Sequence, residues 1–166
     1  CIYMKFLLLI SIIIGAIFLY SSINQKNIDT DTNLSAENSA NWLTDFSEAK
    51  AKAKEEGKPI LMDFTGSNWC GWCIKLKKEV FSKPAFIDYA DEYLILMTVD
   101  FPRGVKLEES LLDQNYRLLD QYGVNSFPTI ILVDAEGSIL GITGYERGGP
   151  EAYVAHLKSL LANTDY

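Results

Sequence analysis

The chain has 166 residues, 48% of them hydrophobic, and carries 15 Lys and Arg against 22 Asp and Glu, a formal net charge of −7. That length fits one domain of ordinary size, and the acidic balance excludes the basic surface that a nucleic-acid partner would need. Three cysteines are too few for a disulfide-stapled fold. Cys1 stands alone, whereas Cys70 and Cys73 form a Cys-x-x-Cys pair.

The first 22 residues are typical of a targeting segment. Lys5 precedes an uncharged apolar run from Phe6 to Tyr20, which suits a signal peptide and is short for a spanning helix of about 20 residues. We expect a cleaved signal peptide at 1–22, with an uncleaved inner-membrane anchor as the alternative. Residues 23–41 are rich in Asn, Asp, Ser and Thr and are predicted to form a flexible linker.

Residues 42–166 are predicted to form the working domain, in which helices and strands alternate. The predicted elements are a helix at 42–57, a strand at 59–65, a helix from the WCGWC segment to Pro84, a strand at 93–100, a helix at 107–122, strands at 129–134 and 138–143, and a helix opened by Pro150. Parallel strands with helical crossovers, finished by an antiparallel hairpin, predict an α/β fold with a central mixed sheet flanked by helices.

The chemistry of the sequence is concentrated in the segment WCGWC. Cys70 lies where a predicted strand passes into a helix, and free N–H groups and the helix dipole at that point favour a thiolate. We therefore expect a lowered pKa and nucleophilic reactivity at Cys70. Cys73, one helical turn later, is close enough to attack a mixed disulfide formed at Cys70. The neighbouring Trp69 favours exposure of the pair.

Three other roles for the cysteine pair remain open. A structural zinc site needs four ligands, and after export only the two cysteines and His156 would remain, so no metal is expected. A purely structural disulfide across so short a loop would restrain little chain entropy. Two buried core cysteines are the third alternative.

The segment from Trp42 to Asn163 resembles the thioredoxin superfamily, and within it the exported bacterial thioredoxin-like disulfide reductases. The resemblance rests on the strand that ends at Asp63-Phe64, the WCGWC turn, Phe127-Pro128-Thr129 before a strand, and the closing hairpin and helix. It implies dithiol–disulfide exchange without a cofactor, with Cys70 acting before Cys73. We expect a monomer in the periplasm.

The resemblance also implies roles for residues around the pair. Pro128 matches a cis proline that packs against the cysteines, and the preceding residue, Phe127, would offer backbone hydrogen bonds to an extended substrate. The alternative is an ordinary trans proline that begins a strand. Phe127 is bulkier than the usual aliphatic residue, which would narrow substrate choice. Trp69, Gly71 and Trp72 are expected to border the substrate.

Asp63 matches a buried acid that assists proton transfer to the second cysteine. Burial would raise its pKa and allow it to act as a general base for Cys73. This sequence departs from the family at two points. Asp63 lies seven residues before Cys70 instead of six, and Leu96 replaces the lysine that usually accompanies the acid. The proton-transfer role of Asp63 is therefore a hypothesis.

The direction of electron flow is predicted from the residues between the cysteines. Gly71-Trp72 contains no cation that would stabilise the thiolate further, so we expect a reducing potential closer to thioredoxin than to a strong oxidant. An exported reductase would act on disulfide-containing exported proteins and would need a membrane-embedded thiol relay as electron donor. The alternatives are a disulfide oxidase or isomerase, or a non-enzymatic module that binds peptides or delivers reductant.

Overall fold

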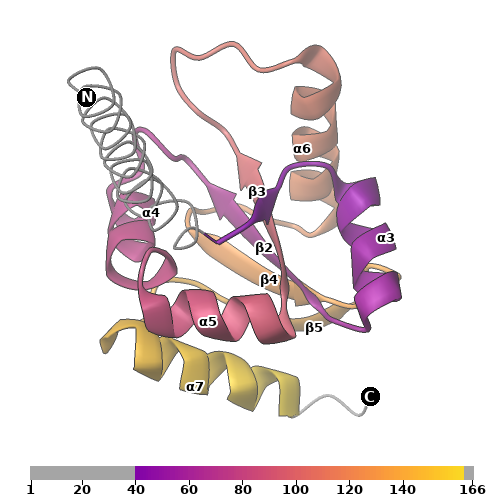
Figure 1. Cartoon of the computed structure of the whole chain (residues 1–166). Helices are drawn as coiled ribbons and strands as arrows, with labels where there is room; N and C mark the ends of the chain where they lie inside the picture. The colour runs from indigo at the N-terminus through magenta and orange to yellow at the C-terminus, as the bar shows by residue number, and fades with distance from the viewer. Residues whose placement is uncertain (1–39, 163–166) are drawn as a thin grey trace, which may run out of the picture. The chain divides into compact units, whose positions relative to one another are not determined.

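The computed structural model describes residues 40–162 (Figure 1). The predicted signal peptide or anchor at 1–22 and nearly all of the predicted linker lie outside the described residues. Residues 40–162 belong to one compact unit. No helix in this described part is both long and apolar enough to cross a membrane.

A five-stranded mixed sheet forms the centre of this unit, with strand order β1-β3-β2-β4-β5 (Figure 1). Its strands are β1 (Trp42–Leu43), β2 (Ile60–Thr65), β3 (Ile95–Asp100), β4 (Thr129–Val133) and β5 (Ile139–Thr143). β1 and β2 both run parallel to β3, whereas β4 is antiparallel to β2 and to β5. The predicted α/β class, with a mixed sheet and a closing hairpin, is confirmed.

Helices cover both faces of the sheet. They are α3 (Phe46–Glu56), α4 (Gly71–Leu76), the π-helical turn η1 (Lys77–Phe81), α5 (Pro84–Tyr93), α6 (Glu109–Gln121) and α7 (Gly149–Ala162). α4, α5 and α7 lie on one face, and α3 and α6 on the other (Figure 1). Successive residues of β2 enter different cores: Leu61 packs with α5 and α7, and Met62 packs with α3 and α6. Burial on both faces explains why apolar residues occupy the successive positions 60–62 of this strand.

The predicted helix start at Trp42 is wrong. Trp42 and Leu43 form the short edge strand β1, whose side chains alternate between the two cores. α3 begins at Phe46, because the carboxylate of Asp45 caps it by accepting the Glu48 N–H at 2.7 Å. Two residues are too few for the alternation typical of a strand to be recognised in the sequence.

Helix α5 is absent from the predicted elements, and the strand that follows it begins later than predicted. Pro84 was expected only to end a helix, but it is the first residue of α5, where its missing N–H has no helical partner to lose. Phe86 and Ala90 are buried in the core beneath α5. Tyr93, the predicted start of a strand, is the last residue of α5, and β3 begins at Ile95.

Candidate active site

The candidate site lies at the carboxyl ends of the parallel strands β2 and β3. Thr65 and Asp100 are paired at the last position of both strands. The segments that follow, Gly66–Trp69 and Phe101–Arg103, therefore leave the sheet side by side. The first of these segments leads directly to the cysteine pair.

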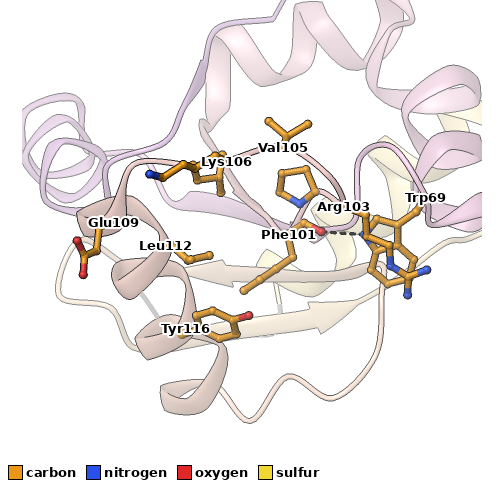
Figure 2. A pocket seen from close by; sticks show the side chains of 10 residues that line it. Trp69, Phe101, Arg103, Val105, Lys106, Glu109, Leu112 and Tyr116 are labelled. Carbon is orange, nitrogen blue, oxygen red and sulfur yellow. Dashed lines mark hydrogen bonds between the residues drawn. The ribbon is translucent and has the colours of Figure 1, made fainter.

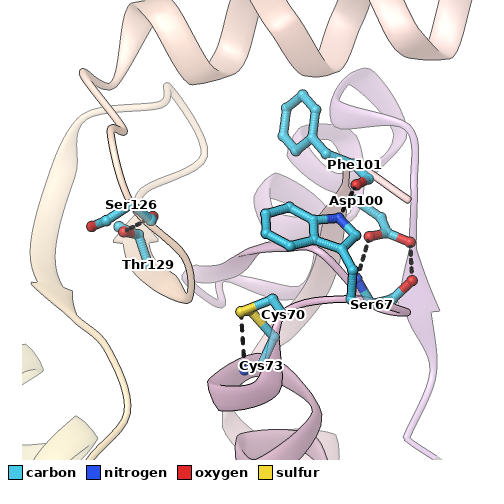
Figure 3. The surroundings of a disulfide bond; sticks show 8 residues. Ser67, Cys70, Cys73, Asp100, Phe101, Ser126 and Thr129 are labelled. Atoms are coloured by element: carbon cyan, nitrogen blue, oxygen red, sulfur yellow. Dashed lines mark hydrogen bonds between the residues drawn. A yellow bond between two sulfur atoms is a disulfide. The ribbon is translucent and has the colours of Figure 1, made fainter. Parts of the chain in front are cut away.

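Hydrogen bonds join the turn before the cysteines to the loop after β3. The backbone N–H and hydroxyl of Ser67 donate to the Asp100 carboxylate at 2.9 and 2.6 Å (Figure 3). The Asn68 amide donates to the Arg103 carbonyl at 2.8 Å and accepts the Arg103 N–H at 3.0 Å. The Trp69 indole N–H donates to the Phe101 carbonyl at 2.7 Å. The turn that is one residue longer than the family pattern is thus held by the neighbouring loop.

Cys70 and Cys73 form a disulfide, with their Cα atoms 5.2 Å apart (Figure 3). Cys70 occupies the N-cap of α4, as predicted, and its Sγ accepts the Cys73 N–H at 3.2 Å. The prediction that the pair is exposed is wrong, because Cys70 is only 7% and Cys73 only 5% exposed. Cys70 also lines a cavity.

This cavity, of about 410 Å³, brings together the predicted residues Trp69, Cys70 and Phe127. The indole of Trp69 meets the Phe127 ring edge-on, with centroids 6.0 Å apart. The segment from Ser126 to Thr129 lies across from the disulfide (Figure 3). The Phe127–Pro128 peptide bond is cis, as the resemblance implies. The remaining lining residues are Leu119, Val124, Asn125 and Ser126.

Trp72 and Gly71 are exposed and do not line the cavity at Cys70. The Trp72 side chain, 53% exposed, lies beside Tyr145 with ring centroids 5.1 Å apart. The ammonium group of Lys75 is 5.0 Å from the centroid of each ring. Trp72 therefore belongs to a separate aromatic and cationic cluster on the surface of α4, which the sequence analysis did not predict.

Asp63 lies on the central strand β2, and its Oδ1 is shielded from solvent without a hydrogen-bond partner in the described part of the chain. Burial raises the pKa of Asp63 from its ordinary 3.8 to about 7, the charge of Asp100 adds to the rise, and Lys77 opposes it. The predicted direction is therefore confirmed. Leu96, at the position of the usual lysine, is buried in β3, and the cation that acts on Asp63 comes from η1.

No metal site is evident within residues 40–162. No three His, Cys, Asp or Glu side chains of this range are grouped so that they could hold an ion. His156, on α7, lies 2.9 Å from the Thr143 hydroxyl through its Nε2.

Sequence comparison decides the family. Residues 46–160 match the family of thioredoxin-like domains. The chain belongs to this family. It is 40% identical over 116 residues to the disulfide bond reductase DsbH of Chlamydia pneumoniae, an alignment that covers 70% of each protein. It is also 32% identical over 127 residues to the thioredoxin-related protein DsbJ of the same organism, covering 72% of this chain but 36% of DsbJ.

Solved structures agree with this assignment to the thioredoxin-like family. The structure of a DsbH oxidoreductase superposes with a TM-score of 0.72 at 37% identity, covering 76% of this chain and 87% of that one. The oxidised C-terminal domain of DsbD from Neisseria meningitidis, at 19% identity and a TM-score of 0.51, covers 68% and 90% and shows the shared fold. With its Cys70–Cys73 pair, this thioredoxin-like chain is a disulfide oxidoreductase.

The loop after β3 is the part of the site that the sequence analysis missed. Asp100, Phe101 and Arg103 all contact the turn that leads to Cys70. A signal was present in the sequence, because two consecutive strands joined by a helical crossover run parallel and bring the residues after their carboxyl ends together.

Proposed function

We propose that the chain reduces protein disulfides, with Cys70 as the attacking and Cys73 as the resolving cysteine. The observation that carries this proposal is the N-cap position of Cys70: its Sγ accepts the Cys73 N–H, and the residue lines a cavity together with Trp69 and Phe127. After reduction, the same N–H would stabilise a thiolate on Cys70.

The reaction would proceed in two exchanges. The Cys70 thiolate attacks one sulfur of a substrate disulfide, so that a Cys70–substrate disulfide forms while the substrate S–S bond breaks and releases a thiolate. Cys73 then loses its proton and attacks Cys70 Sγ, which forms the Cys70–Cys73 disulfide and releases the second substrate thiolate. Two electrons pass from the dithiol to the substrate, and two protons complete its thiols.

Asp63 would accept the proton of Cys73 in the second exchange. A carboxyl group with a pKa of about 7 can both take up and release a proton near neutral pH. Its Oδ1 has no competing hydrogen bond within the described residues. We assign this role to Asp63 on those two properties.

The substrate would bind as an extended segment beside Phe127 and Pro128. Backbone hydrogen bonds of the strand-addition type would hold it there, with Trp69 forming one wall. Gly71 and Trp72 would border the substrate from the exposed start of α4, where a side chain at Gly71 would meet no other atom within 4 Å. The bulk of the Phe127 ring would restrict the residues that enter.

The surroundings of the cysteines and the activity of a relative both favour reduction over oxidation. No basic side chain stands between the cysteines, and the nearby Lys75 is engaged by Trp72, Tyr145 and Glu79. The relative that is 40% identical is a disulfide bond reductase. With the predicted signal peptide or anchor, we infer that the chain acts in the periplasm, as a monomer, on exported proteins, and receives electrons from a membrane-embedded thiol relay.

Insulin reduction with the full-length chain tests this proposal. With dithiothreitol as electron donor, the wild-type chain should accelerate insulin precipitation, whereas Cys70→Ser should abolish the acceleration. Cys73→Ser should accumulate a mixed disulfide between Cys70 and its substrate. An oxidase would instead form disulfides in reduced ribonuclease faster than it cleaves those of insulin. A binding module would do neither, and either result would refute the reductase assignment.

A further inference from the structure

A second cavity, of about 510 Å³, shares Trp69 with the cavity at Cys70. It lies between the loop that follows β3 and helix α6, with Trp69 at one end (Figure 2). Trp69 therefore borders both cavities. The mechanism proposed above uses only the cavity at Cys70.

The second cavity has a preformed apolar wall. The Phe101 ring stacks on Phe127 with centroids 5.4 Å apart, and the Tyr116 ring meets Phe101 edge-on at 5.3 Å. The hydrogen bond from the Trp69 indole to the Phe101 carbonyl holds the end wall. Val105 and Tyr116 leave more than half of their surface exposed, 56% and 57%. An apolar side chain of a bound peptide would cover part of this surface.

Two cations border the same cavity. The Arg103 guanidinium lies 3.9 Å from the centroid of the Trp69 ring, and Lys106 lies farther along the loop (Figure 2). Within residues 40–162, neither forms an ion pair, since the salt bridges there involve Lys52, Lys58 and Lys75. Among the described residues, Glu109 is the one carboxylate that lines the cavity. On a chain with a net charge of −7, this local excess of positive charge favours an acidic ligand.

We propose that this second cavity is a specificity site for the protein substrate. The cavity binds an apolar side chain of the substrate, and Arg103 and Lys106 pair with an adjacent Asp or Glu. The assignment rests on the proposed function, which places a cysteine of the substrate at Cys70. A substrate segment that crosses Trp69 from there would place its neighbouring residues in the second cavity. The ligand is thus an extended apolar and acidic segment of a disulfide-containing protein.

Matched peptides test the assignment. Each carries one cysteine in a mixed disulfide with mercaptoethanol, and a Leu-Glu, Leu-Lys or Ser-Glu pair is stepped along the peptide from that cysteine. The reduced full-length chain should show kcat/KM about fivefold higher for the best Leu-Glu peptide than for its Leu-Lys counterpart, the scale of an exposed ion pair. It should prefer Leu-Glu to Ser-Glu by about tenfold.

Variants separate the cavity from a general effect of charge. Arg103→Gln and Lys106→Gln should each reduce the preference for Glu over Lys, and Arg103→Lys should retain part of it. Arg117→Gln is the matched control, because Arg117 is exposed on α6 and does not line the cavity. Tyr116→Ser should reduce the preference for Leu over Ser.

The outcomes distinguish this proposal from the proposed function. Hydroxyethyl disulfide, which is neutral and too small to reach the second cavity, reports the basal exchange at Cys70. Reduction of this compound without any Leu-Glu preference, or with a preference that Arg103→Gln and Lys106→Gln leave intact, would overturn the specificity site alone. Failure to reduce it would contradict the proposed function and this assignment with it. A wild-type dimer that Tyr116→Ser dissociates would show that a second copy occupies the cavity and would also overturn the assignment.

Discussion

The carboxylate of Asp100 accepts two hydrogen bonds from Ser67, one from the backbone N–H at 2.9 Å and one from the hydroxyl at 2.6 Å. These bonds fasten the turn before Cys70 to the end of β3. The same carboxylate raises the pKa of Asp63. Asp100 thus links the position of the cysteine turn to the electrostatics of the proposed proton acceptor.

Loss of the Ser67–Asp100 contact should destabilise the fold by a measurable amount. Ser67→Ala removes the hydroxyl donor and should lower the free energy of unfolding by about 1 kcal/mol, whereas Asp100→Asn weakens both charge-assisted bonds and should cost about 2 kcal/mol. Urea unfolding measures both. The double variant should cost less than the sum of the two, and strict additivity would show that the side chains are not coupled.

The stability of the chain should fall as the pH rises through the titration of Asp63. Its pKa is 3.8 when unfolded and about 7 when folded, so between these values the folded state binds more protons. The contribution of protonated Asp63 to the free energy of unfolding is full below about pH 4 and is lost as the pH rises to about 7. The loss is at most about 4 kcal/mol for a shift of some three pKa units.

Urea unfolding of Asp63→Asn across this pH range checks the prediction. The variant should lack the decline seen in the wild type, and Asp100→Asn should move the decline to lower pH because it removes a charge that raises the pKa of Asp63. Asp88→Asn, the same change on an exposed position of α5, should leave the decline in place. An unaltered slope in Asp63→Asn would assign the pH dependence to another group.

Proton acceptance by Asp63 should appear in the second exchange. Asp63→Asn should slow resolution of a preformed Cys70 mixed disulfide by roughly 10- to 100-fold near neutral pH, toward the range typical of a lost general base. Stopped-flow measurement of the released thiol reports this rate, and its pH profile should lose the step near pH 7. An unchanged profile would remove the assignment, and Asp88→Asn again provides the control.

Gly66 should not tolerate a side chain. A Cβ at this position would overlap the Trp69 indole, which is held by the Phe101 carbonyl and cannot move without breaking that bond. Gly66→Ala should therefore cost about 1–3 kcal/mol and shift the tryptophan fluorescence. Gly71→Ala is the matched control for stability, because a Cβ there meets no other atom within 4 Å. Equal stability of the two variants would contradict the packing described for Trp69.

The sequence predicts best where period and composition act over several residues. The apolar run at Ile60–Phe64 and the hairpin around Gly137 are strong signals because burial on both faces and a tight turn each restrict the residue types. Trp42–Leu43 is too short for any period to appear. α5 was missed because Pro84 marks both a helix end and a helix start, and only the tertiary packing of Phe86 distinguishes them.

The parts of the site that depend only on neighbouring residues in the sequence can be predicted. The strand-to-helix step places Cys70 at an N-cap without reference to distant residues. The partners of the turn, Asp100 and Arg103, lie more than 30 residues away and depend on the parallel pairing of β2 with β3. The cavity at Cys70 has the same origin, since Leu119, Val124 and Phe127, which line it, are also distant in the sequence.

The reduction potential of the Cys70–Cys73 pair tests the central claim most directly. It can be measured in the full-length chain by equilibration with glutathione or dithiothreitol buffers and quantification of the free thiols. The proposed reductase should have a potential near that of thioredoxin, about −270 mV. A value near that of a strong oxidant, about −120 mV, would contradict the account and assign the chain to disulfide formation.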